Sequence, residues 1–149
     1  MKIFLTAILS LISFTTAFAG QKIDAATWKS VQTYDVPTLL KQETSLIGKI
    51  VAVRFQYRSA KLSHRTPRVY EAAIWQHDPT SKKGYSGLHV AIMKENVKAF
   101  ETITSNSNSA AEVTLYAIVE KHPDANLAQL RVLGLKATTD AAGNATIDW

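Results

Sequence analysis

Hydrophobic and polar positions alternate along the chain just after Gly48. One side of an extended chain would carry Val51, Val53, Phe55 and Tyr57, and the other Ala52, Arg54, Gln56 and Arg58. Successive side chains of a β-strand point to opposite faces, so this alternation predicts a strand over residues 50–59 with one buried and one exposed face.

Four more segments are typical of strands, at residues 69–76, 88–93, 111–121 and 128–136. The first of these is largely apolar on both faces, which predicts a central strand with Trp75 in the core. We expect the third and fifth strands of the series to turn His89, Gln129 and Arg131 outward. Between the third and fourth strands, residues 94–104 place apolar side chains at three-residue spacing, which predicts a helix.

The predicted strands have flanking segments of different character. Residues 20–45 form an N-terminal helical segment, in which Asp35 is the N-cap of a short helix with Pro37 in its first turn. Asp24 caps a second short helix or lies in an irregular arm. Residues 60–68 and 77–87 are predicted loops, and residues 138–149 are expected to form a loose C-terminal tail.

The first 19 residues have the pattern of a secretory signal peptide. Lys2 is followed by an uncharged apolar run, and Ala17-Phe18-Ala19 fits the small-x-small cleavage rule. We therefore expect cleavage after Ala19, a mature chain starting at Gly20, and a periplasmic or secreted protein without a membrane anchor.

Composition limits the chemistry that this chain can perform. The sequence has no cysteine, which excludes disulfides, thiolate catalysis and zinc–thiolate sites. Lys and Arg number 17 against 12 Asp and Glu, so the chain is mildly basic, and anionic partners are allowed but not required.

Five strands with a helix between the third and fourth resemble the OB-fold, a small five-stranded Greek-key barrel. The opening Leu46-Ile-Gly-Lys-Ile-Val-Ala-Val53 is similar to the first strand of OB-like domains in exported bacterial proteins. The resemblance covers residues 46–137 and implies a mainly β fold. Because the first strand has no second glycine where many OB domains bend, we expect a bulge near residues 56–59.

The resemblance implies a ligand surface across the second and third strands, flanked by loops. In this chain that surface would hold Tyr70 and His89, with Tyr85 nearby in a loop. Cations would meet phosphate or carboxylate groups, and Tyr70 would stack on a ring. The candidate binding residues are Arg54, Arg58, Lys61, His64, Arg65, Arg68, Tyr70, Tyr85, His89 and Arg131.

No motif for catalysis, metal binding or a cofactor is evident. The four histidines lack ligand spacing, and no Gly-x-Ser-x-Gly elbow or glycosidase-like carboxylate pair occurs. Our hypothesis is a non-enzymatic exported domain that binds an anionic ligand, either a polymer or a partner protein. Two alternatives stay open: an interaction or inhibitor module that uses Trp28 and Trp149 at its ends, and an enzyme with an unfamiliar site.

Overall fold

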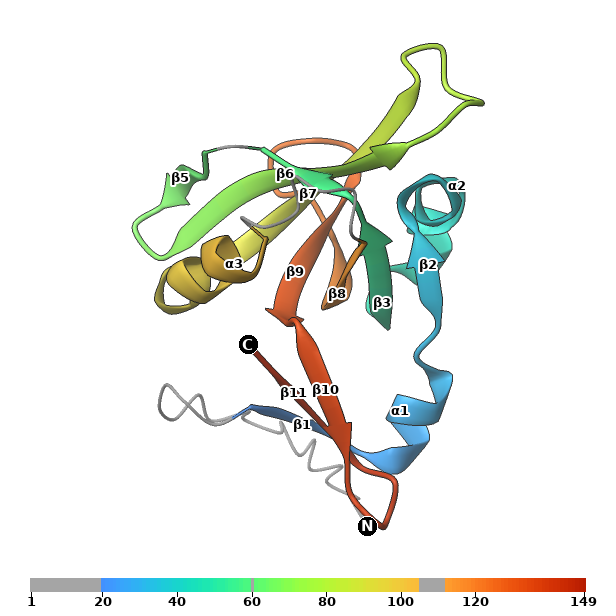
Figure 1. The fold of residues 1–149 in the computed structure, drawn as a ribbon, viewed down its shortest axis with the longest axis vertical. Helices are drawn as coiled ribbons and strands as arrows, with labels where there is room; N and C mark the ends of the chain where they lie inside the picture. Colours follow the sequence, from blue (N-terminus) through green and yellow to red (C-terminus); the bar gives the residue numbers. More distant parts are fainter. Residues whose placement is uncertain (1–19, 60, 105–111) are drawn as a thin grey trace, which may run out of the picture.

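The computed structural model describes residues 20–59, 61–104 and 112–149, so the predicted signal peptide lies outside the described residues. The mainly β class is confirmed. The described residues hold eleven strands in two sheets, where the sequence predicted five strands. The tip of the hairpin formed by β6 (Val69–His77) and β7 (Tyr85–Met93) and the smaller sheet lie at opposite ends of the long axis (Figure 1).

The larger sheet contains eight strands. Its pairing order is β2–β3–β8–β9–β7–β6–β4, and β5 pairs with β6 off this path. Neighbours are antiparallel except β2 with β3 and β7 with β9. The bounds are β2 Thr33–Asp35, β3 Ile50–Phe55, β4 Tyr57–Arg58, β5 Ser63–Thr66, β6 Val69–His77, β7 Tyr85–Met93, β8 Val113–Lys121 and β9 Ala128–Gly134.

The predicted first strand is divided at Gln56 into β3 and β4. β3 pairs with β8, whereas β4 pairs with β6. Gln56 donates its backbone N–H to the Trp75 carbonyl at 3.2 Å, although Tyr57 is the strand partner of Trp75. Gln56 and Tyr57 therefore both lie opposite Trp75, which makes a β-bulge. It lies within residues 56–59, where the sequence predicted one. The irregularity also turns Tyr57 outward to 39% exposure, so its predicted place on the buried face is wrong.

Alternation explains the core of this sheet. Alternate residues of three strands are buried: Val51, Val53 and Phe55 of β3, Leu88, Val90 and Ile92 of β7, and Leu115, Ala117 and Val119 of β8. Phe100, on the helix between β7 and β8, is fully buried and packs in the same core. Gln129 lies on the side of β9 opposite its core neighbour Leu130, as predicted, but it is covered there and only 2% exposed.

Three α-helices and one 3-10 turn occur in the described residues: α1 Ala25–Ser30, α2 Val36–Leu46, η1 Lys94–Asn96 and α3 Val97–Thr104. The predicted N-cap is confirmed, because Asp35 accepts from the Thr38 N–H at 2.7 Å. Of the two alternatives for Asp24 the structure has the helix cap, with the Thr27 N–H donating at 2.9 Å. Leu39 of α2 is fully buried, and α2 packs against β3, β6 and β7. None of these helices is long and apolar enough to cross a membrane.

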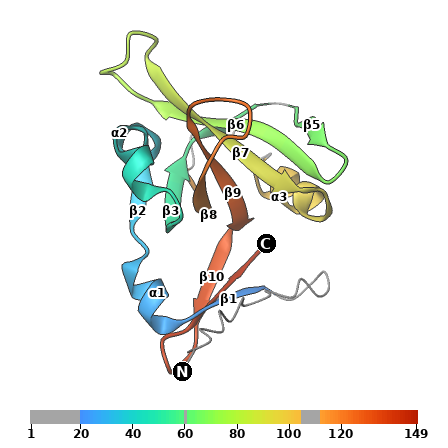
Figure 2. The same cartoon turned by 180° about the vertical axis from the view of Figure 1, so that it is seen from behind.

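The C-terminal segment is a β-hairpin, so the predicted loose tail is wrong. β10 (Lys136–Thr139) and β11 (Ala145–Asp148) pair with each other, and β11 also pairs with β1 (Gln21–Ile23) (Figure 2). Ile147 is fully buried. Trp28 packs against Tyr116 at 5.7 Å between ring centroids, beneath this small sheet.

Gly134 allows β11 to approach the end of β9. A Cβ atom at this position would lie 2.3 Å from the Asp148 carbonyl oxygen, which is closer than atoms can pack. The same oxygen accepts a hydrogen bond from the Leu135 N–H at 2.7 Å. Close contact with the terminal hairpin therefore requires glycine here.

Candidate ligand-binding face

One face of β6 and β7 points away from the core, and we call it the outer face. Ala72 and Ile74 of β6 are buried, whereas the residues that alternate with them are partly or fully exposed. Leu88 and Val90 of β7 are buried in the same way. The outer face therefore carries Glu71, Ala73, Trp75 and His77 from β6 and Tyr85, Gly87 and His89 from β7.

Three aromatic rings cross this face, and we call Tyr57, Trp75 and Tyr85 the aromatic row. The Trp75 ring lies 6.3 Å from the Tyr57 ring at 27° and 6.5 Å from the Tyr85 ring at 47°. Tyr57 is 39% and Tyr85 50% exposed. Gly87, the strand partner of Trp75 on β7, has no side chain to cover the indole. The two tyrosines of the row are therefore open to solvent, and Trp75 between them is partly exposed.

The loop next to the aromatic row, between β6 and β7, is held by Asp78. Its side chain accepts hydrogen bonds from the Thr80 N–H at 2.9 Å and from the Ser86 hydroxyl. These bonds, that from Ser86 first, lower the pKa of Asp78 from 3.8 to about 2. Gly84 closes the loop at φ +76°, a backbone conformation that suits glycine.

Lysines on the same loop supply positive charge. Lys82 and Lys83 are exposed, and no acidic side chain of the described residues forms an ion pair with either. Asp78, the nearest acid in sequence, is 7% exposed and turned into the loop. The end of the hairpin thus presents cations beside open rings.

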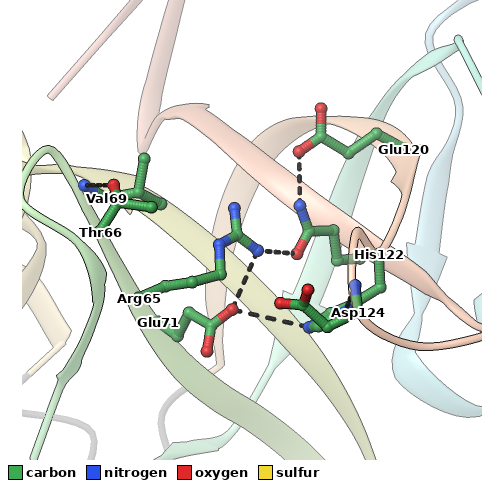
Figure 3. Close-up of polar contacts among 8 residues, drawn as sticks. Arg65, Thr66, Val69, Glu71, Glu120, His122 and Asp124 are labelled. Atoms are coloured by element: carbon green, nitrogen blue, oxygen red, sulfur yellow. Dashed lines mark hydrogen bonds and ion pairs between the residues drawn. The ribbon is translucent and has the colours of Figure 1, made fainter.

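The side chains of a second set of outer-face residues form hydrogen bonds and ion pairs with one another. We call this set the polar relay: Arg65, Glu71, His122, Gln129, Glu120 and Arg131. Figure 3 shows its central part. Arg65 donates to Glu71 at 2.9 Å and to the Gln129 side-chain oxygen at 2.7 Å. Gln129 in turn donates to Glu120 at 2.6 Å, and Arg131 donates to the other oxygen of Glu120 at 3.1 Å.

His122 completes the relay beside Glu71. Its Nδ1 accepts from the Asp124 N–H at 3.1 Å, so the neutral ring carries its proton on Nε2. That Nε2 lies 3.6 Å from the Glu71 carboxylate. The His89 ring lies 5.6 Å from the His122 ring, between the relay and the aromatic row.

Several residues predicted to bind a ligand are bonded to the protein itself. Arg65 and Arg131 belong to the relay. Arg58 bonds to Thr104 and to the Glu101 carbonyl at the end of α3, so the structure does not place it on an open surface. Arg54 lies on β3 and is 3.8 Å from Glu112.

The remaining predicted residues lie on β5, β6 and β7 or in the loops that flank β5. Tyr70 shares the inward side of β6 and is half-buried against the core, so its predicted place on the outer face is wrong. The His64 ring lies 4.0 Å from it. Lys61 and Arg68 are exposed, but Arg68 precedes β6 at the end opposite Trp75.

Sequence reasoning missed Tyr57, Trp75, Lys82 and Lys83, and named only Tyr85 from the aromatic row. A signal for Trp75 was present: Glu71 and His77 share its side of the strand, and a charged residue marks the outward face. Within the described residues, no group of three or more His, Asp or Glu side chains is placed to hold a metal ion.

Comparisons with known proteins do not identify a family. No family model matches this sequence, and no curated protein matches it. A solved structure from Klebsiella pneumoniae, named "putative nucleic acid-binding lipoprotein", is 21% identical at a TM-score of 0.47, over 69% of this chain and 89% of that one. One from Leishmania major, named "putative aspartyl-tRNA synthetase", is 16% identical at a TM-score of 0.43, over 77% of this chain but only 22% of that one.

Proposed function

We propose that this chain is an exported, non-enzymatic, OB-like domain that binds single-stranded nucleic acid on the outer face of β4, β6 and β7. The aromatic row beside Lys82 and Lys83 is the observation that carries this proposal. Every base has a flat face that can stack on an aromatic ring, and each phosphate attracts a cation.

Strand order supports the OB-like part of the proposal. If β3 and β4 count as one strand, the larger sheet contains the order first, second, third, fifth, fourth and back to first. A strand that pairs with the fourth strand at one end and with the second at the other curls a sheet towards a barrel. α3 lies between the third and fourth strands, as the resemblance implies.

The partners of the relay cations limit which cations on the outer face can bind a phosphate. Arg65 and Arg131 already have carboxylate partners, and a ligand phosphate would have to compete with them. Lys82 and Lys83 have no such partner among the described residues. The proposed contact is therefore at the β6–β7 hairpin, away from β5.

The experiment is fluorescence anisotropy of the mature chain with a labelled single-stranded oligonucleotide, between about 50 and 200 mM salt. Trp75→Ala should weaken binding about tenfold, because stacking on one ring is worth roughly 1–3 kcal/mol per base. Lys82→Ala with Lys83→Ala should flatten the salt dependence. The matched control is Lys94→Ala with Lys98→Ala, which removes two exposed lysines on η1 and α3.

The same assay separates the competing ligand classes. A sulfated polysaccharide that competes fully, together with unchanged binding by the Trp75→Ala variant, would mean charge recognition without stacking and overturn the nucleic-acid proposal. Absence of binding at the lowest salt would overturn the anionic ligand class and favour a partner protein. Export is tested by the N-terminal residue of the protein recovered from the periplasm or medium, which should be Gly20.

A further inference from the structure

Two neighbouring regions of the surface expose large apolar side chains. Among the described residues, four large hydrophobic side chains are well exposed: Ile47 at 47%, Tyr57 at 39%, Tyr85 at 50% and Leu127 at 37%. The two tyrosines belong to the aromatic row, and the other two border a groove.

This groove consists of two adjoining hollows between α2 and the β8–β9 turn. Both hollows are lined by Glu43 and Leu127. One of them reaches Gly87 on β7, and the other reaches Ile47 and Lys121. Since Gly87 is the strand partner of Trp75, the groove begins beside the middle ring of the aromatic row.

Glu43 stands out among the acidic residues of this region. It is half-buried, it lines both hollows, and no described residue forms an ion pair or a side-chain hydrogen bond with it. By contrast, Glu71 and Glu120 are both paired in the relay. A carboxylate without a partner in a groove lined by both apolar and polar side chains is available to accept hydrogen bonds from a ligand.

We propose that the groove is a base-recognition subsite in which Glu43 accepts hydrogen bonds from the amino group of cytosine, adenine or guanine. This inference rests on the proposed function, because the base belongs to the strand that stacks on the aromatic row. Leu127 and Ile47 contact the flat faces of the ring, and Lys121 at the far end attracts the following phosphate.

The chemistry of the bases makes this subsite selective. Cytosine presents a donor, its N4 amino group, where uracil and thymine present a carbonyl oxygen. A carbonyl oxygen against the Glu43 carboxylate would repel it and leave both acceptors unpaired. The groove should therefore disfavour uracil and thymine.

The test compares oligo(dC) with oligo(dU) of roughly a dozen nucleotides by anisotropy. The wild-type protein should bind oligo(dC) about tenfold more tightly, the discrimination expected of one good side-chain pairing with a base. Glu43→Gln should bring the two affinities close together, because an amide can donate as well as accept. Glu95→Gln removes the same charge from an exposed position at the opposite end of β7 and should keep the tenfold preference.

The possible failures are distinguishable. Equal affinity of the wild type for both oligonucleotides, or an unchanged preference in Glu43→Gln, would overturn the base-recognition subsite. Dependence on Trp75 would still support the proposed function in that case. Binding of neither oligonucleotide would overturn both proposals. The wild-type comparison needs no variant, so it stands whatever Glu43→Gln does to folding.

Discussion

The aromatic row and the polar relay lie on the same side of one sheet, but their side chains find partners in different ways. In the relay, Arg65 and Arg131 each bond to a carboxylate, and Gln129 joins the two pairs while only 2% exposed. In the row, the rings contact one another and Tyr85 remains 50% exposed. A charged residue is therefore no guide to binding until its partners are known.

The difference predicts a separation of roles. The relay is partly buried, with Gln129 2% and Arg65 17% exposed, so breaking it leaves polar groups short of partners where water reaches them only in part, which costs folding free energy. Removing a half-exposed ring costs little folding free energy but removes a surface on which a ligand can stack. Relay variants should lose stability, and row variants should lose affinity.

The largest expected effect comes from Gln129→Leu. Leucine cannot accept from Arg65 or donate to Glu120, so we expect the free energy of unfolding to fall by roughly 2–3 kcal/mol. Urea unfolding followed by fluorescence measures it. Gln42→Leu, at an exposed position of α2, is the control and should stay within about 0.5 kcal/mol. A similarly small loss for Gln129→Leu would mean that the relay contributes nothing to folding.

Two cations, Arg65 of the relay and Lys83 of the β6–β7 loop, allow stability and affinity to be compared in both regions. The expected effects are smaller. Arg65→Ala should lower the free energy of unfolding by roughly 1–2 kcal/mol, because Arg65 is 17% exposed and bonds to two partners, and should leave oligonucleotide affinity unchanged. Lys83→Ala should leave stability unchanged and lower the salt slope of binding by about one. Loss of affinity in Arg65→Ala with none in Lys83→Ala would reverse the assignment of the two regions.

Features set by neighbouring residues could be predicted from the sequence. The N-caps at Asp24 and Asp35 depend on a carboxylate three residues before a free N–H. The inward sides of β7 and β8 follow from alternation over consecutive residues. These patterns fix the elements because their causes lie within a few positions of each other.

Features set by distant residues could not be predicted in this way. Arg65 reaches Gln129 across 64 positions, and Asn144 accepts from the Ala25 N–H across 119. The burial of Gln129 and the pairing of the terminal hairpin with β1 both depend on such contacts. The irregularity at Gln56 was expected, but which way it would turn Tyr57 depends on pairing with β6. The sequence therefore did not indicate the aromatic row, and it suggested that the basic residues of the relay were available to bind a ligand.

The smallest expected effect concerns the loop that holds Tyr85 at the end of the row. The Ser86 and Thr80 hydrogen bonds lower the pKa of Asp78 to about 2 from 3.8. A carboxyl group with a lower pKa in the folded state stabilises that state fully above about pH 3.8 and loses this effect as the pH falls through about 2. The difference in melting temperature between wild type and Asp78→Asn should therefore stay constant from neutral pH to about 4 and shrink below it.

An NMR titration of the Asp78 carboxyl should show a midpoint near 2, and Ser86→Ala should move it upward because the first cause of the shift is gone. A wild-type midpoint at the ordinary value would mean that the loop does not hold Asp78, and the aromatic row would then lack the fixed end that distinguishes it from a mobile hairpin tip.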